Sequence, residues 1–209
     1  MGKRYRLKRP FDYLVALVGV FVSIPAWILI SYAVWLQDYG PIFFTQERVG
    51  FRGKIFMGYK FRSMIRDAER YTGPIQAQEG DKRITRVGMF LRKTALDELP
   101  QLWNILKGDM PFVGPRPLRP AEIEVGKTDS ESLTDIQYAA LRTSIMPGLT
   151  GVAQVFASRT VTREEKFKYD LWYKEHQSLA WDIRLIAVSF WISFCRKWDT
   201  KKKGFERVL

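Results

Sequence analysis

The chain has 209 residues and a formal net charge of +12, from 34 Lys and Arg against 22 Asp and Glu. Hydrophobic residues make up 46% of the chain, which excludes a disordered or low-complexity protein. One cysteine, Cys195, excludes an intramolecular disulfide, and one histidine, His176, excludes a His-rich zinc site. The basic excess predicts an anionic partner such as nucleic acid, a phospholipid surface or a phosphorylated substrate.

An uncharged, mostly apolar segment of 24 residues runs from Tyr13 to Leu36. A helix needs about 20 apolar residues to cross a bilayer core. A cleaved signal peptide is disfavoured, because the segment is too long for a signal-peptide core and no A-x-A-like cleavage site follows it. A core helix of a small soluble domain is disfavoured by the length together with Trp27 and Trp35. We therefore predict that this segment inserts into a membrane.

Pro25 lies in the middle of the apolar segment. Because proline has no N–H, the carbonyl of Phe21 loses its helical partner, and the hydroxyl of Ser23 can take up part of the backbone hydrogen bonding. One interpretation is a kinked spanning helix. The other is helix–break–helix with two legs of ~10–12 residues, each about 15–18 Å long, which reach only about halfway through a ~30 Å core.

Charge at the two ends of the chain favours the second interpretation. Five basic residues precede the apolar segment and six more lie near the C-terminus. Basic segments stay in the cytoplasm, so both ends on that face is the simpler topology. We predict a basic N-terminus with a re-entrant membrane helix over residues 1–37 and a cytoplasmic domain over residues 38–209. The expected fold class is α+β, mostly helical, with a compact domain and interfacial amphipathic helices.

Shorter elements follow from local patterns in the rest of the chain. Aromatic runs around Gly50 and Gly53 predict two strands, and Gly108 marks the end of a helix. The strands are expected at 41–45 and 53–59, and helices at 63–70, 85–93, 97–107, 162–175 and 181–198. The last helix is too interrupted by charge to span a membrane. It lies either at the interface, with Trp181, Trp191 and Trp198 near the headgroups, or buried in the core.

Two adjacent carboxylates, Asp97 and Glu98, open the helix expected at 97–107. Asp97 is expected as the N-cap, whose oxygens accept backbone N–H bonds at the positive end of the helix. A carboxylate kept ionised in this way is a candidate nucleophile or metal ligand. For an isolated Asp-Glu pair, however, a simple cap with an acidic first turn would be the better interpretation.

Cations near this pair shift the interpretation toward phosphate chemistry. Arg116 stands between Pro115 and Pro117, which fix the backbone and pre-orient the guanidinium for bidentate phosphate binding. Lys60 and Arg62 follow a predicted strand. Each cation alone would be a solvated surface charge, but together with two carboxylates they predict a site for phosphate and a divalent metal. Nucleic acid is disfavoured, since no helix-turn-helix, zinc-finger or RNP-type motif is present and the basic residues are interleaved with acids. No GxxxxGK[ST] motif is present, which excludes P-loop chemistry.

The sequence also resembles a known family in ordered blocks along nearly the whole chain. These are 8–12 (KRPFD), 40–50 (GPIFFTQERVG), 60–64 (KFRSM), 80–85 (GDKRIT), 91–94 (LRKT), 96–102 (LDELPQL), 114–117 (GPRP), 147–155 (PGLTGVAQV) and 170–173 (DLWY). In them the chain is similar to the bacterial sugar transferases, the monotopic phosphoglycosyl transferases that start glycan assembly on polyprenol phosphate. It looks like their small catalytic form.

The resemblance implies a re-entrant membrane helix broken at Ser23 and Pro25, at the cytoplasmic face of the bacterial inner membrane. It implies a catalytic dyad, Asp97 and Glu98, that binds magnesium. It further implies transfer of a sugar-1-phosphate from a UDP-sugar to polyprenol (undecaprenol) phosphate, with Asp97 as the covalent nucleophile and UMP as the leaving group.

Other parts of this scheme are less sharply defined. Arg116 is expected to hold phosphate oxygens, and the weaker candidates are Lys60, Arg62 and Arg142. Met146 stands where the family usually has Lys, so the identity of the transferred sugar stays open. Whether the protein forms a homo-oligomer also stays open. The segment 121–138 matches no block and is expected as a mobile loop over the site. The alternative function is a non-enzymatic, membrane-tethered scaffold that binds anionic lipid through its basic face.

Overall fold

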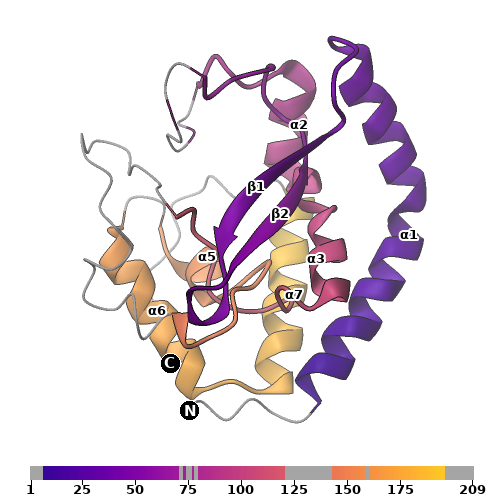
Figure 1. Cartoon of the computed structure of the whole chain (residues 1–209). Coiled ribbons are helices and arrows are strands. Elements are labelled where there is room, and N and C mark those ends of the chain that lie inside the picture. Colours follow the sequence, from indigo (N-terminus) through magenta and orange to yellow (C-terminus); the bar gives the residue numbers. More distant parts are fainter. Residues whose placement is uncertain are drawn as a thin grey trace.

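The computed structural model of the chain describes residues 7–70, 73, 77, 80–120, 143–158 and 161–195. Within these ranges, one two-stranded antiparallel sheet lies among helices (Figure 1), which confirms the mostly helical α+β class for this part of the chain. The long N-terminal helix α1 (Lys8–Leu36) runs along one flank of the molecule, and α6 (Arg163–Glu175) lies on the opposite flank (Figure 1).

Helix α1 contains the whole apolar segment in 29 residues, with Pro25 inside it. Among the described residues it is the one helix that is long and apolar enough to cross a membrane. Only 11% of its most apolar window is buried, so it does not resemble the core helix of a soluble protein. An exposed apolar helix of this length fits membrane association.

The chain stays helical through the predicted break. The Ser23 hydroxyl donates to the carbonyl oxygen of Gly19 at 2.6 Å, one turn earlier, and the Trp27 indole N–H donates to Ser23 Oγ at 3.0 Å. Ser23 therefore does bond to the backbone, but to Gly19 rather than to the carbonyl that Pro25 leaves without a partner. The separation of α1 into two legs is not confirmed, and the re-entrant geometry stays a prediction.

The sheet is a hairpin of β1 (Phe43–Val49) and β2 (Ile55–Phe61), with Phe43 opposite Phe61 and Val49 opposite Ile55. The short 3₁₀ turn η1 (Phe51–Gly53) joins them, and Gly53 has a φ of 78° that glycine adopts without strain. Two strands were expected here, at 41–45 and 53–59, and each begins two residues later than predicted. The second begins later because the turn occupies residues 51–53.

Two contacts fix the C-terminal half of α1 to this hairpin. The Trp27 ring meets the Phe61 ring edge-on at 5.4 Å, and Phe61 stacks on Phe43 at 5.4 Å. Just after α1, Asp38 accepts two hydrogen bonds from Arg62, from Nη1 at 2.6 Å and from Nη2 at 2.5 Å. A bidentate pair of this kind is strong and directional.

The remaining helices mostly follow the sequence patterns. They are α2 (Arg86–Thr94), the 3₁₀ turn η2 (Leu96–Glu98), α3 (Gln101–Lys107), α5 (Val152–Phe156), α6 and α7 (Leu179–Phe194). Thr85 caps α2, and Thr162 opens α6 with a capping box. The predictions at 85–93 and 162–175 are confirmed, the end of α3 at Gly108 is confirmed, and α7 covers most of 181–198.

The helix predicted at 63–70 is wrong. Met64 forms an isolated antiparallel bridge with Ile84, and Ile65 N donates to the Arg83 carbonyl oxygen at 2.8 Å. This long-range pairing holds residues 63–65 extended and takes hydrogen bonds that a helix would have needed, and residues 66–70 form turns instead.

Helix α7 is neither fully buried nor polar on its outer side. Asp182 and Leu185 are buried, whereas Phe190, Trp191 and Phe194 are 68%, 64% and 82% exposed. The alternative of a plain buried helix therefore does not fit, while the interfacial position stays a prediction. Trp198 lies outside the described residues, as do Arg142 and the segment 121–138.

Buried polar side chains join the start of α1 to α6 and α7. Lys8 forms ion pairs with Asp182 and with Asp12, the latter at 3.4 Å. Tyr173 OH donates to Asp182 Oδ1 at 2.6 Å, and Asp12 Oδ1 accepts from the backbone N–H of Phe112 at 3.1 Å. These contacts tie the first turn of the apolar helix into the core of the domain.

Candidate active site

The carboxylate pair sits on a short 3₁₀ turn between two helices. Helix α2 ends at Ala95, whose φ of 56° reverses the chain and starts η2. Helix α3 then begins at Gln101 with Pro100 as its N-cap, a place where the missing N–H of proline costs nothing. Asp97 is therefore not an N-cap, and this prediction is wrong, because the chain makes a separate turn before α3.

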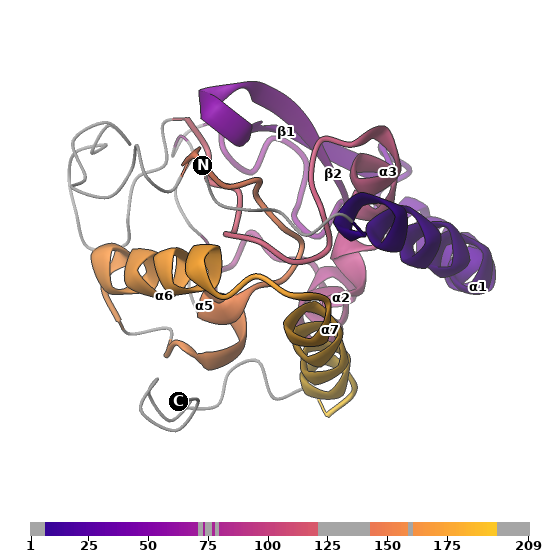
Figure 2. The ribbon, with the colours of Figure 1, turned by 90° about the horizontal axis from the view of Figure 1, so that it is seen from below.

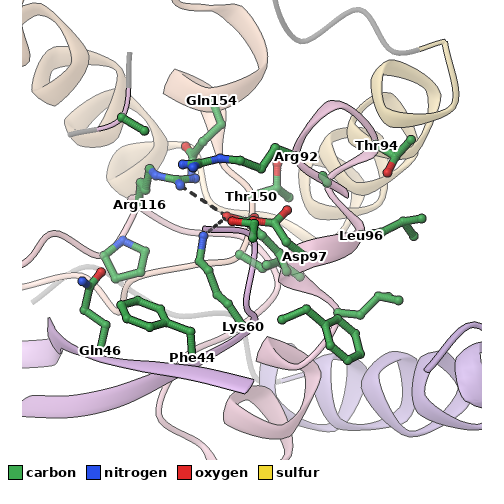
Figure 3. Close-up of a pocket in the computed structure, with 18 of the residues that line it drawn as sticks. Phe44, Gln46, Lys60, Arg92, Thr94, Leu96, Asp97, Arg116, Thr150 and Gln154 are labelled. Carbon is green, nitrogen blue, oxygen red and sulfur yellow. Dashed lines mark hydrogen bonds and ion pairs between the residues drawn. The ribbon is translucent and has the colours of Figure 1, made fainter. Parts of the chain in front are cut away.

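Glu98 is held by two cations from distant parts of the chain. Lys60 Nζ lies 2.5 Å and Arg116 Nη2 lies 3.3 Å from the same oxygen, Glu98 Oε1. Figure 3 marks these contacts by dashed lines from the labelled Lys60 and Arg116. Lys60 comes from β2 and Arg116 from the loop after α3. The structure thus brings together the predicted dyad and two of the four predicted phosphate-binding cations.

Asp97 is more buried than Glu98 and makes fewer polar contacts. Its residue is 7% exposed, and among the described residues no hydrogen bond reaches its carboxylate. The positive charges of Lys60, Arg92 and Arg116 act on it without direct contact. Its oxygens are therefore available to a substrate phosphorus or to a metal ion.

The pKa values of the two carboxyls are shifted in opposite directions. Burial raises the pKa of Asp97, and the negative charge of Glu98 adds to this effect. Burial also opposes ionisation of Glu98, but the charges of Lys60 and Arg116 outweigh it and hold the pKa of Glu98 at about 2. Glu98 is thus the permanent anion of the pair, and Asp97 is the member that takes up a proton first.

Glycines let the loop of Arg116 pack directly against the segment that follows Pro147. A Cβ at Gly148 would lie 2.1 Å from the backbone nitrogen of Gly114, and one at Gly151 would lie 2.3 Å from the Gly114 carbonyl oxygen. Gly148 N donates to the Pro115 carbonyl oxygen at 2.8 Å. Larger residues would push the two segments apart, so this packing fixes the direction in which Arg116 leaves the backbone.

One of the predicted cations, Arg62, does not belong to this cluster. The guanidinium of Arg62 is buried and paired with Asp38, so it serves the junction of α1 and the hairpin rather than the dyad. Its assignment to phosphate binding does not fit this geometry. Arg142 lies outside the described residues, and its role stays a prediction.

Arg92 and Arg48 complete the cluster and were missing from the predicted set. Arg92, on α2, points toward the same space as Arg116 (Figure 3), and its charge acts on Asp97. Arg48, on β1, donates from Nη1 to the carbonyl oxygen of Pro117 at 3.0 Å, which steadies the Arg116 loop from the other side. Arg92 could have been found from its place in the LRKT block, just before the dyad.

The donor set fits magnesium rather than a metal caged by protein. No group of three or more His, Cys, Asp and Glu side chains gathers in the described ranges. Mg²⁺ commonly takes one or two carboxylates and completes its shell with substrate phosphates and water. If magnesium binds here, Asp97 and Glu98 would offer it two hard oxygen ligands of this kind, and the nearby cations would suit the phosphates.

The sequence model of the bacterial sugar transferases matches residues 3–196, nearly the whole chain. The chain belongs to the bacterial sugar transferase family. This member is 36% identical over 194 residues to the undecaprenyl-phosphate galactose phosphotransferase of Salmonella typhimurium, with 86% of this chain and 39% of the relative covered.

Other relatives differ in the sugar that their names carry. The chain is 37% identical over 201 residues to the UDP-glucose:undecaprenyl-phosphate glucose-1-phosphate transferase of Escherichia coli, covering 94% of this chain and 42% of the relative. It is 49% identical over 118 residues to a putative undecaprenyl-phosphate N-acetylgalactosaminyl 1-phosphate transferase of Bacillus subtilis, covering 56% and 65%. The chain thus spans about two fifths of the Salmonella and Escherichia relatives.

Proposed function

We propose that this family member transfers a sugar-1-phosphate from a UDP-sugar to polyprenol phosphate. The observation that carries the proposal is the buried, unengaged carboxylate of Asp97 beside a permanent anion and three cations. The names of the relatives supply the substrate classes, undecaprenyl phosphate and UDP-sugars. The apolar helix α1 fits a reaction whose acceptor is a lipid.

In the first step, an oxygen of Asp97 attacks the sugar-proximal phosphorus of the UDP-sugar. A new Asp–O–P bond forms, the bond between the two phosphates breaks, and UMP leaves with the electron pair. Arg116 and Lys60 hold phosphate oxygens and offset the charge that develops on them. Magnesium bound by Asp97 and Glu98 would neutralise the diphosphate, which otherwise repels an anionic nucleophile.

In the second step, an oxygen of polyprenol phosphate attacks the same phosphorus. The Asp–O–P bond breaks, Asp97 returns as a carboxylate, and the product carries the sugar on a lipid diphosphate. Glu98 keeps its charge through both steps, because the pKa of its carboxyl is held at about 2. It therefore acts as a fixed anion rather than as a proton carrier at neutral pH.

The test is release of UMP by the full chain in detergent micelles, with magnesium and polyprenol phosphate present. UDP-glucose, UDP-galactose and UDP-N-acetylgalactosamine are offered separately, since relatives are named for each of these sugars. We expect one of them to give UMP and a lipid-linked product in equal amounts. No UMP from any UDP-sugar, with vesicles of anionic lipid still bound, would favour the scaffold alternative.

We also infer that α1 enters the membrane from the cytoplasmic face of the inner membrane without crossing it. Both of its ends contact the same domain: Arg9 at the start donates to the Ile105 carbonyl oxygen at 2.6 Å, and Asp38 just past the end pairs with Arg62. A spanning helix would hold its ends on opposite sides of a ~30 Å apolar core. The contacts at both ends therefore support a monotopic position.

Cysteine labelling tests this topology. In a Cys195→Ser background, Leu7→Cys places a thiol at the exposed start of α1, and Lys54→Cys places one in the exposed hairpin turn. We expect a membrane-impermeant maleimide to label both sites only in inside-out vesicles, in which the cytoplasmic face is accessible. Labelling of only one of the two sites in intact spheroplasts, Lys54→Cys above all because the basic N-terminus should stay inside, would show that α1 spans the membrane.

Replacing Arg116 by lysine is expected to reduce kcat by roughly 10- to 100-fold. Lysine keeps the charge but loses the planar fork that holds two phosphate oxygens at once. The control is Arg52→Lys in the hairpin turn, which should keep wild-type rates because Arg52 lies outside the site. An Arg116→Lys enzyme with near-wild-type kcat would mean that Arg116 serves only as a general cation.

The pH dependence of the reaction should follow Asp97. Its carboxyl must be ionised to attack, and burial raises its pKa, so the rate should fall with decreasing pH well above the pKa of about 2 of Glu98. Lys60→Met removes a charge that lowers both pKa values, so the acid limb should move to higher pH. Initial rates of UMP release across about pH 4 to 8 measure this shift. Lys54→Met, an exposed substitution, should leave the limb unmoved.

A further inference from the structure

We propose that the polyprenyl tail of the acceptor lies in an apolar slot between α1 and α7, at the far end of the groove that contains the dyad. The inference rests on the proposed function and assigns a place to one of its substrates. The slot is defined by side chains of the two helices: Val15, Val18 and Val22 of α1, and Ile186, Phe190 and Phe194 of α7.

One continuous, open groove links this slot to the catalytic pair. The residues that line it include both slot helices and also Lys60, Asp97 and Arg116. Leu102 and Leu149, which belong to or pack on the apolar core, line it as well. A molecule in the groove therefore meets cations and carboxylates beside the dyad, and mostly aliphatic and aromatic walls, with Ser23, Ser189 and Ser193 among them, beside α1 and α7.

The two helices are joined at their starts and present apolar walls beyond. Lys8 in the first turn of α1 pairs with Asp182 in the first turn of α7, which sets the two helices side by side at the base. In Figure 2, α1 lies on the side of the molecule opposite α6, and α7 lies between them. Because α1 is the membrane-associated helix, a slot on its inner face is within reach of lipid.

The walls of the slot are unusually exposed for apolar side chains. Val22 is 76%, Phe190 68% and Phe194 82% exposed. Leaving such surface in water costs about 25 cal/mol per Å², so bilayer lipid or the apolar part of a substrate is expected to cover it. A UDP-sugar has no long apolar part to offer.

Charge and polarity together select one occupant. The cationic end of the groove suits a phosphate, and the apolar end suits a hydrocarbon chain. An amphiphile with an anionic head and an aliphatic tail satisfies both ends at once. Polyprenol phosphate is such an amphiphile, and its phosphate would then reach the phosphorus carried by Asp97 while its tail stays in the slot.

Two substitutions test the slot from its two walls. Val22→Trp narrows it from α1, and Phe190→Ala removes part of the wall on α7. Each should raise the KM for undecaprenyl phosphate about tenfold or more, since each disturbs contacts of the size of one buried side chain. The KM for the UDP-sugar should stay within about twofold, because the nucleotide end of the groove is unchanged.

Matched controls lie on the same helices but outside the groove. Ile28→Trp on α1 and Ile183→Ala on α7 change exposed apolar residues, 65% and 51% exposed, that do not line it. Both should keep the wild-type KM for the lipid. Dimethylallyl phosphate, whose five-carbon tail has little apolar surface to place in the slot, should be used equally well by the wild type and by all four variants.

The outcomes distinguish a failure of the slot proposal from a failure of the proposed function. If the wild type turns over and the slot variants match their controls in the KM for undecaprenyl phosphate, the slot is overturned and the proposed function stands. If the slot variants lose affinity for the short and the long acceptor alike, the substitutions act on the phosphate end and the slot is again overturned. If the wild type transfers no sugar phosphate, the proposed function fails, and the inference fails with it.

Discussion

Asp97→Asn is expected to lower kcat by at least about a thousandfold, the scale seen when a covalent nucleophile is removed. The amide keeps the shape of the carboxylate but does not form the acyl phosphate. Since Asp97 caps no helix and accepts no hydrogen bond from the described residues, the fold should survive the change. The measurement is UMP release, with thermal unfolding recorded in parallel.

The covalent step is isolated by leaving out the lipid. With labelled UDP-sugar alone, the wild type should trap label on the protein, and added polyprenol phosphate should release it. Asp97→Asn should trap none. Glu98→Gln, which removes the fixed anion but leaves the nucleophile, should turn over slowly yet still trap some label. Label on Asp97→Asn at the wild-type level would place the nucleophile elsewhere, and turnover by a wild type that never traps label would require direct displacement.

Local patterns in the sequence were enough to predict those elements whose hydrogen bonds join residues close in sequence. Thr85 before α2 and Thr162 before α6 are caps whose partners lie three residues away, and both helices form where they were expected. The segment 63–70 has equally plausible local propensity, but its backbone pairs with residues 83–84. That partner lies about twenty residues on, where a local pattern carries no information.

The site was predictable to the extent that its residues are adjacent in sequence or occur in motifs. Asp97 and Glu98 are neighbours, so they had to be close. Lys60 and Arg62 show the limit, because they were given the same role but are separated by the end of β2 at Phe61. Lys60 turns to Glu98, whereas Arg62 is taken by Asp38, 24 residues earlier in the chain. Only the packing of α1 against the hairpin decides between these partners.

The second large effect is expected on stability, from a substitution at the start of α1. Lys8→Met is expected to lower the free energy of unfolding by about 3–5 kcal/mol, the usual cost of removing one partner from a buried ion pair. The side chains of Lys8, Asp12 and Asp182 are 3%, 0% and 0% exposed, so water does not replace the lost cation. For a chain of about 200 residues this corresponds to a fall in Tm on the order of 10 °C, measured by circular dichroism in detergent micelles.

Two variants decide whether the buried charge is the cause. Lys54→Met makes the same change at an exposed turn and should alter stability by no more than about 0.5 kcal/mol. Lys8→Met combined with Asp182→Asn removes the cation and one of the carboxylates with which it pairs, while the amide keeps an acceptor for Tyr173 OH. The double variant should therefore recover part of the loss, because it removes a buried negative charge together with the positive charge that paired with it. Equal stability of Lys8→Met and Lys54→Met would show that the cluster does not fasten α1 to the domain.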